Sequence, residues 1–286
     1  MREKLKSVLS VNDFRRKVIN VTMISLIVIS SLIAIFPLMS VFVFVFQKGF
    51  STLSLNFFTS LPAPVGEMGG GMAQSLLGSA MLIGLASLIG VPWGIASGIY
   101  ITEYGHGKSA WFLRFSNDLL MGIPSIVVGL FTYSFIVAPM KGFSLLAGSI
   151  ALGIIMIPIV SRSTEEILKT VPQHIREAGL ALGISRYRVI LNIILRGSWG
   201  GILTGVILSV ARISGETAPL LFTSFNNQYW SGSLTQPISS LPVQIYTYAI
   251  SPFEDWQKQA WAGALVLILF IFTINVTVRF IFRKNK

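Results

Sequence analysis

The chain of 286 residues is 53% hydrophobic and only 12% charged, and it carries a formal net charge of +11. Soluble domains contain about 25% charged residues, so this composition and a mean hydropathy of +0.73 exclude an ordinary soluble domain and indicate an integral membrane protein. Because the chain has no cysteine, disulfides, thiolate catalysis and zinc–thiolate sites are excluded. His106 and His174 stand alone in the sequence, so no metal centre is expected.

Six apolar segments are candidates for spanning helices, which need roughly 20 residues each. The basic segment 1–17 precedes the first of them, 18–47, which contains no charged residue and is too long for the core of a signal peptide. We therefore expect a retained first helix, followed by a polar external loop that ends at residue 71. The other predicted spans are 72–101, 118–139, 145–161, 197–221 and 259–282.

Three glycines of the second span, Gly90, Gly94 and Gly98, follow one another at intervals of four residues. They remove the side-chain bulk from one face of the helix, which allows a neighbouring helix to approach closely in lipid. We expect such close packing in preference to a helix that merely tolerates glycine. A similar row in the fifth span consists of Gly197, Gly201 and Gly205.

The limits of the next two spans are predicted from single residues. Asp118 is expected to begin the third span, because a carboxylate in the first turn interacts favourably with the helix dipole. This capping role is preferred to a role in transport. The fourth span is expected to end at Pro158 and Arg162, since proline interrupts helices.

The lysine and arginine residues indicate the orientation of the spans. If the N-terminus is cytoplasmic, the inner segments hold 18 of these residues and the outer segments hold three, with Arg212 inside a span. Basic residues concentrate on the cytoplasmic side of membrane proteins. We therefore expect a multi-pass protein of the cell membrane with both termini in the cytoplasm. The net charge then reflects topology, and no nucleic acid is needed to explain it.

Residues 162–196, which are cytoplasmic in this topology, alternate charged and apolar side chains. Such a mixture is typical of short amphipathic helices that lie on a membrane surface or against a protein. Within this stretch, Glu177–Gly183 and Ile193–Leu195 resemble the EAA loop of ABC-importer permeases, although Gly179 stands at the second alanine of the motif and Arg196 at the usual proline. The resemblance implies a short coupling helix that docks in a groove of a separate ATP-hydrolysing subunit.

The residues around this motif are consistent with docking. Ala178, Gly179 and Ala181 keep one side of the short helix slim, so that it can enter a groove, while Arg176 and Glu177 offer charge-assisted contacts to a partner. Gly183 predicts the C-terminal end of the helix. The alternative is a solvated loop that its arginines hold near anionic lipid headgroups.

Two charged residues, Arg212 and Glu216, lie in the fifth span, where a charge at the bilayer centre costs on the order of 3 kcal/mol. Because they are four residues apart, we expect them on one helix face, within reach of an ion pair. Either the pair only neutralises itself and fixes the rotation of the helix, or Arg212 lines a translocation path and binds an oxyanion while Glu216 acts as its partner or gate. The neutral donors expected nearby are Ser209, Ser214 and Thr217.

The segments Ala211–Thr223 and Asn227–Trp230, together with the later motifs QPI, LPV, SPF and WAGAL, resemble the PstA-type permeases of phosphate importers. The resemblance covers about residues 72–282 and is most specific in the C-terminal third. It implies a heterodimer with a related permease, two copies of an ATPase that binds ATP and Mg, and an external phosphate-binding protein. Because the chain has no nucleotide motif, we expect no cofactor and no enzymatic activity in it.

The loop 224–258 is expected outside the membrane, with a short helix over 242–251. Its aromatic side chains form either a docking surface for the binding protein or anchors at the membrane interface. These residues are Tyr229, Trp230, Tyr246, Tyr248 and Trp256.

Together these features predict an all-α integral membrane protein with six transmembrane helices, the type I ABC importer permease fold and both termini in the cytoplasm. The expected function is that of the permease subunit of an ATP-driven importer of inorganic phosphate. The alternatives are an ABC permease for another oxyanion, such as molybdate or sulfate, and an autonomous ion-coupled transporter. The expected segments are a basic N-terminal segment (1–17), a first helix with its external loop (18–71), a transmembrane domain (72–282) that contains the coupling loop (162–196), and a cytoplasmic tail (283–286).

Overall fold

The computed structural model describes residues 2–67, 69–105 and 107–283. In these ranges the regular structure is helical, and the β-bridge between Pro62 and Gly70 is isolated. The prediction of an all-α protein is therefore confirmed. His106 and the tail residues 284–286 lie outside the described residues.

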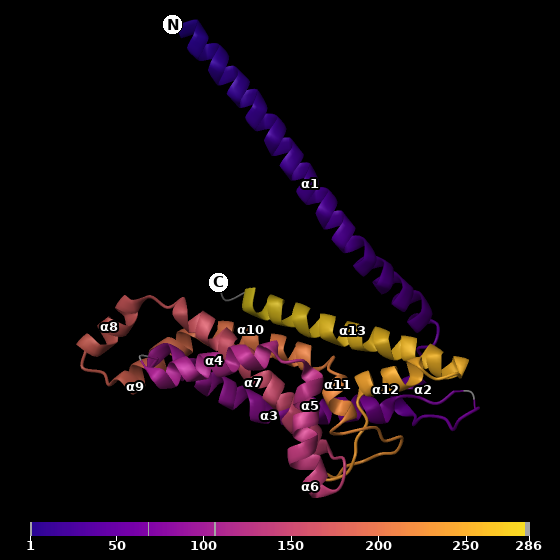
Figure 1. Cartoon of the computed structure of the whole chain (residues 1–286). Coiled ribbons are helices and arrows are strands. Elements are labelled where there is room, and N and C mark those ends of the chain that lie inside the picture. The colour runs from indigo at the N-terminus through magenta and orange to yellow at the C-terminus, as the bar shows by residue number, and fades with distance from the viewer. Residues whose placement is uncertain (1, 68, 106, 284–286) are drawn as a thin grey trace.

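The first helix, α1 (Arg2–Phe50), projects from the rest of the molecule (Figure 1). It starts within the predicted basic segment and continues without a break into the predicted first span. Its C-terminal end meets α13 (Glu254–Arg283), where the ring of Phe44 lies edge-on to that of Trp261 with 5.1 Å between the centroids. A Cβ atom on Gly49 would lie 2.6 Å from the carbonyl oxygen of Trp261, so glycine permits this close approach.

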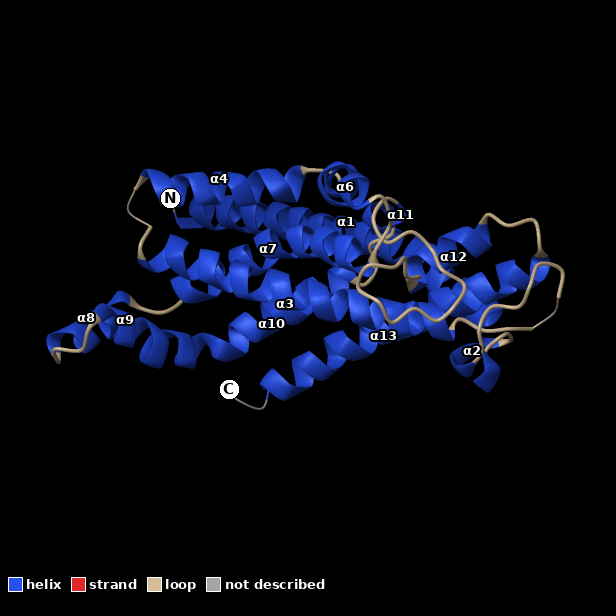
Figure 2. Ribbon diagram, turned by 90° about the horizontal axis from the view of Figure 1, so that it is seen from below, coloured by secondary structure: helices blue, strands red, loops and turns tan. Residues whose placement is uncertain are grey.

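Three long helices lie side by side in the bundle (Figure 2): α3 (Ala73–Glu103), α7 (Leu145–Lys169) and α10 (Leu195–Ile213). The described residues contain five helices long and apolar enough to cross a membrane, and among these α7 has the largest buried share, 61% of its apolar window. If the bent pair formed by residues 108–122 and 125–140 is counted as one further span, the number rises to six, which is the number expected.

The short helices mark the two ends of the bundle (Figures 1 and 2). At one end lie α8 (Gln173–Ala181) and α9 (Arg186–Val189), which we call the α8 end. At the other end lie α2 (Leu55–Thr59) and α12 (Leu241–Ala249), which we call the α12 end. The short helix predicted over 242–251 is present as α12, which begins at Leu241 and ends at Ala249.

The glycine row of α3 forms the contact with α7. Cβ atoms added at Gly90, Gly94 and Gly98 would each lie less than 3 Å from an atom of α7, so any larger residue would force the two helices apart. The predicted close packing is confirmed. The three residues that these Cβ atoms would meet are, in order, Met156 at 2.8 Å, Val160 at 2.6 Å and Thr164 at 2.6 Å.

The predicted third span, 118–139, is not one straight helix. Instead α4 (Lys108–Gly122) and the helix that begins with α5 (Ser125–Thr132) meet at 104° across Ile123 and Pro124. Proline disfavours the helical conformation in the residue before it, and Ile123 is accordingly extended, with a ψ of 131°. Beyond α5 the chain continues through a π-helical turn (Tyr133–Val137) and α6 (Ala138–Met140).

The prediction that Asp118 caps the third span is wrong, because α4 begins at Lys108 and Asp118 lies near its C-terminal end. The carboxylate of Asp118 lies 3.8 Å from the guanidinium of Arg162, and both side chains are exposed. Asp118 therefore contributes to a surface ion pair between α4 and α7, a type of contact that adds little to stability.

The predicted end of the fourth span at Pro158 and Arg162 is also wrong, since α7 continues to Lys169. Proline is tolerated inside spanning helices where neighbouring groups satisfy the freed backbone. Ion pairs between residues four apart support the additional turns. They join Arg162 to Glu166 at 3.0 Å and Lys169 to Glu165 at 2.6 Å.

The predicted fifth span, 197–221, starts earlier and ends earlier in the structure. The helix runs from α9 through a π-helical segment (Ile190–Ile194) into α10 and ends at Ile213. A separate short helix, α11 (Ala218–Leu221), follows with Pro219 in its first turn. Residues between these two helices therefore have no continuous helical frame.

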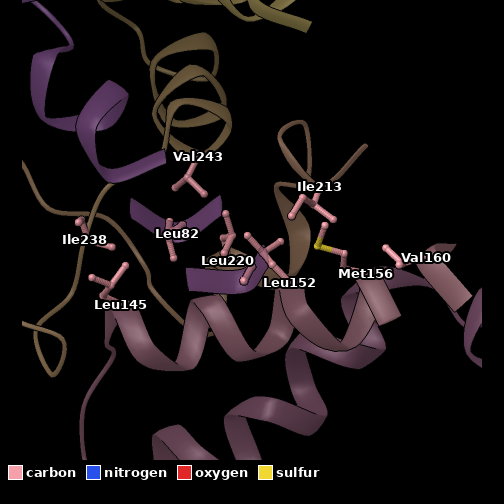
Figure 3. Packing of buried hydrophobic residues seen from close by; sticks show 10 residues of the cluster. Leu82, Leu145, Leu152, Met156, Val160, Ile213, Leu220, Ile238 and Val243 are labelled. Carbon is pink, nitrogen blue, oxygen red and sulfur yellow. The ribbon is translucent and has the colours of Figure 1, made fainter. Parts of the chain in front are cut away.

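The main hydrophobic core holds these elements together (Figure 3). Leu82 of α3, Leu152 of α7 and Leu220 of α11 converge in it, with Val243 of α12 above them. Because α11 and α12 pack onto the α3–α7 pair here, the end of α10 is held at the same place. The other members are Ala86, Leu145, Met156, Val160, Ile213 and Ile238.

Candidate functional site

Arg212 lies in the last turn of α10, beside the bend between α4 and α5. There it borders a cavity of about 160 Å³, together with Glu216. Both helices of the bent pair and α7 contribute to its wall. The other lining residues are Leu120, Met121, Ile123, Pro124, Ser125, Val128, Ile155 and Ile159. We call this space the Arg212 cavity.

The expected ion pair between Arg212 and Glu216 is absent from the described structure. After Ile213 the backbone hydrogen bonds join residues three apart instead of four. The N–H of Gly215 donates to the carbonyl of Arg212, and the N–H of Glu216 donates to the carbonyl of Ile213, both at 3.2 Å. Such a turn has about three residues, so residues four apart no longer lie above one another. The side chain of Arg212 is exposed and that of Glu216 half-buried.

The predicted neutral donors are placed differently from the two charged residues. Ser209 and Ser214 are buried, and their hydroxyls donate to the carbonyl oxygens of Val206 at 2.6 Å and Val210 at 2.7 Å. Thr217 is half-buried and immediately precedes α11. Of the five predicted residues, Arg212 and Glu216 line the cavity, and the two serine hydroxyls are used within their own helix.

Sequence reasoning missed the other polar residue of this cavity, Ser125. It is the first residue of α5, so the positive end of that helix borders the same space as the guanidinium of Arg212. The signal that could have identified it is Pro124, a proline in the middle of a predicted span. Broken spanning helices commonly direct such helix starts toward anions.

At the α8 end, Gly183 ends the short helix as predicted. It adopts a positive φ of 77°, its N–H donates to the carbonyl of Leu180 at 2.9 Å, and the N–H of Ile184 donates to that of Gly179 at 3.3 Å. This pair of bonds is a Schellman motif, which requires the left-handed conformation that glycine adopts without strain.

Gly179 does not offer a slim face to a partner, contrary to expectation. It is buried, and a Cβ atom there would lie 2.8 Å from Cγ2 of Val189 on α9. The glycine at this position, where the EAA pattern has alanine, therefore lets α8 and α9 pack together. Glu177 and Ala178 are exposed, so they remain available to a docking partner.

Arg176 is likewise turned inward. Its guanidinium lies 2.7 Å from the carboxylate of Glu103, the last residue of α3, and the Arg176 side chain is only 15% exposed. The guanidinium donors of Arg176, which was expected to contact a partner, are used within the chain in this conformation. A larger cavity, of about 740 Å³, lies between this pair and the α8–α9 segment.

The aromatic residues of the loop 224–258 divide into two groups. Tyr248 is 1% exposed and stacks on the half-buried Trp256 with 4.6 Å between the ring centroids, so the ring of Tyr248 is covered and reaches neither a docking partner nor the membrane interface. Burial also raises the pKa of Tyr248, which keeps the phenol neutral. Tyr229, Trp230 and Tyr246 are exposed at the α12 end.

Comparison with known proteins places these features in context. The profile of a family described as "Binding-protein-dependent transport system inner membrane component" matches residues 90–285. The chain is 50% identical over 242 residues to the "Phosphate transport system permease protein PstA" of Yersinia pestis, which covers 84% of this chain and 81% of the relative. It is 46% identical over 273 residues to the protein of that name from Haemophilus influenzae, with 95% and 96% covered.

Solved structures share the fold. An inward-facing structure of the MetNI methionine ABC transporter matches with a TM-score of 0.60 and 14% identity, over 75% of this chain and 97% of that one. The structure of an amino acid ABC transporter with histidines matches with a TM-score of 0.56 and 16% identity, over 73% and 92%. The predicted type I ABC importer permease fold is thus confirmed.

Proposed function

Because this chain belongs to the binding-protein-dependent inner membrane transport components, and among them to the PstA-type permeases, we propose that it is the permease subunit of an ATP-driven importer of inorganic phosphate. The observation that carries the proposal is the position of Arg212. Its guanidinium lies within a candidate membrane span, borders a cavity and has no acidic partner among the described residues. A cation so placed is available to a translocated anion.

The proposed binding chemistry combines Arg212 with the start of α5. A guanidinium presents several donors in a plane, which suits a tetrahedral oxyanion, and the positive end of a helix adds to the attraction. Arg212 and Ser125 line one cavity, so both can act on the same anion. Alternating access then requires that this space open in turn to each side of the membrane.

Glu216 is the residue that favours phosphate over other oxyanions. It lines the same cavity as Arg212 and would repel a fully deprotonated dianion such as sulfate or molybdate. Phosphate keeps a proton near neutral pH and can donate it in a hydrogen bond to a carboxylate. We propose that Glu216 accepts this hydrogen bond in one state of the cycle and acts as a gate in the other.

The proposed orientation places both termini and the α8 end in the cytoplasm of a multi-pass protein of the cell membrane. It rests on the bias of lysine and arginine. The segments then are the basic N-terminal segment (1–17), the first helix and external loop (18–71), the transmembrane domain (72–282) with its coupling loop (162–196), and the tail (283–286).

The proposed partners follow from this orientation. Glu177 and Ala178, exposed on α8, contact one of two ATPase subunits, which bind ATP and Mg, while a homologous second permease completes the path. Tyr229, Trp230 and Tyr246 face an external phosphate-binding protein. This chain has no catalytic role in the proposal. Among its described residues no three His, Cys, Asp or Glu side chains are placed to hold a metal ion.

Uptake by the reconstituted complex tests the proposal. Proteoliposomes with all subunits should accumulate radiolabelled phosphate when ATP is supplied, and sulfate or molybdate in excess should compete weakly. Preferential transport of sulfate or molybdate would instead identify an importer of another oxyanion. Uptake by this chain in the absence of the ATPase would identify an autonomous ion-coupled transporter.

A further inference from the structure

The C-terminal end of α3 is bound by an arginine of the coupling helix α8. Glu103, the last residue of α3, is 4% exposed, and its carboxylate accepts three hydrogen bonds from Arg176. The Nη2 atom of Arg176 donates at 2.7 Å, and its Nε atom lies 3.1 Å from both carboxylate oxygens. Seventy-three residues separate the two partners, so the pair joins distant parts of the chain.

The same guanidinium also holds the end of α7. Its Nη1 atom donates to the carbonyl of Val171 at 2.6 Å, and Nη2 donates to that of Leu168 at 3.0 Å. Carbonyls at the end of a helix have no partner within the helix and need such donors. Arg176 therefore ties α8 to α3 and α7 at once.

A second arginine, on α9, also binds the C-terminal end of α3. Arg186 of α9 donates to the backbone carbonyl of Glu103, and its guanidinium lies 5.0 Å from the ring centroid of Tyr104. Such a cation–π contact adds to the attachment. The segment that faces the proposed ATPase is thus fixed to α3 at both of its short helices.

From this attachment a continuous series of contacts leads to the Arg212 cavity. The row Gly90, Gly94 and Gly98 packs α3 against α7 with almost no space between them. Two residues of α7, Ile155 and Ile159, form part of the wall of the cavity. A displacement of α8 that is transmitted through Glu103 would therefore move the part of the cavity wall that α7 forms, since tightly packed helices move as one body.

We propose that Glu103 and Arg176 are positioning residues that connect the coupling helix to the α3–α7 pair, and that this connection links ATP hydrolysis to the opening of the Arg212 cavity. The inference rests on the proposed function as an ATP-driven permease. It separates two roles on neighbouring residues of α8: Glu177 faces outward to the partner, and Arg176 faces inward to Glu103.

The first test is the ratio of phosphate transported to ATP hydrolysed by the complete complex. Glu103→Gln keeps the shape of the side chain but removes the charge, and it should lower this ratio by about ten-fold, within the range of coupling energies between sites. Arg176→Gln should do the same. The ratio in the double variant should be no lower than in either single variant, because the effects of two substitutions that remove the same contact do not add.

The matched control is Glu166→Gln. Glu166 lies near the C-terminal end of α7 and, like Glu103, pairs with an arginine. Its partner is Arg162, and both side chains of this pair are exposed. Its removal should leave the ratio unchanged, since exposed ion pairs contribute little. An unchanged ratio in the assembled Glu103→Gln complex would overturn the proposal, as would an equal loss in Glu166→Gln.

A second test follows the motion itself and does not depend on the identity of the substrate. The chain has no cysteine, so spin labels can be placed at His174→Cys on α8 and Leu88→Cys on α3, both of them exposed positions. In complexes whose other subunits are also free of cysteine, the label distance should stay constant between nucleotide-free and ATP-bound states. In the Glu103→Gln variant the distribution of label distances should broaden, or its mean should differ between the nucleotide-free and ATP-bound states.

The two tests distinguish failure of the inference from failure of the proposed function. A nucleotide-dependent label distance in the otherwise wild-type chain would show that α8 moves independently of α3 and would refute the connection, even if phosphate uptake is normal. A constant distance in a complex that transports another oxyanion would leave the connection intact and refute only the phosphate assignment.

Discussion

Arg212 and Glu216 border the same cavity without forming an ion pair, although they stand four residues apart in the chain. The helix ends between them, at Ile213, and the tighter turn that follows rotates Glu216 away from Arg212. The pair therefore does not neutralise itself in this conformation. This arrangement favours the interpretation in which Arg212 acts on an anion and Glu216 acts separately as acceptor or gate.

Arg212→Gln should reduce phosphate uptake while the complex still assembles. A hydrogen bond to a charged group contributes about 1.5–3 kcal/mol, so uptake at limiting phosphate should fall by roughly ten- to one-hundred-fold. Uptake in proteoliposomes and co-purification of the subunits would be measured together. Ser209→Ala is the control, because its hydroxyl is directed to its own helix. Normal uptake by Arg212→Gln would reduce this residue to a structural role.

Gly94→Ala should destabilise the permease by about 1–3 kcal/mol, as overpacking of a close contact generally does. The new Cβ atom would lie 2.6 Å from Cβ of Val160 on α7. Gly84→Ala on the same helix is the matched control, since a Cβ atom there meets nothing within 4 Å. Thermal unfolding in detergent would compare the two variants. Equal midpoints would mean that α3 and α7 are not packed as described.

Glu177→Lys should prevent binding of the ATPase. Glu177 is exposed on α8 beside the inward-facing Arg176, and reversing its charge removes a charge-assisted contact and adds repulsion. A pull-down of the ATPase by the tagged permease would measure this. Glu254→Lys reverses an exposed charge at the start of α13 and should leave the pull-down unchanged. Undiminished binding by Glu177→Lys would count against the docking role of α8.

Gly179→Ala should weaken ATPase binding even though it restores the alanine usual in the EAA pattern. The added methyl group would collide with Val189, at 2.8 Å from Cγ2, and displace α8 from α9. Val189→Ala in the same chain should restore binding, because it removes the two methyl carbons nearest to the new atom. The pull-down assay reads out both variants. Failure of the second substitution to rescue would place the defect elsewhere.

Several features of this protein could be predicted from its sequence because they depend on residues close together in the chain. Runs without charge, such as 18–47, identify spanning helices, and the intervals between Gly90, Gly94 and Gly98 identify a face that packs closely. Gly183 marks the end of α8 for the same reason, since a helix end is a local event. The motif around Glu177 predicted a short helix, which the structure contains as α8.

Other features could be seen only in the tertiary structure, because they depend on contacts between distant residues or on a change of backbone geometry. The bend at Pro124 brings Ser125 to the Arg212 cavity, and the end of α10 at Ile213 separates Arg212 from Glu216, whereas spacing alone assumes continuous helices. Glu103 and Arg176 meet across 73 residues, and no local periodicity indicates such a pairing. Buried charges find partners wherever the packed fold brings them together, so the direction in which Arg176 points depends on the whole bundle and not on its neighbours in sequence.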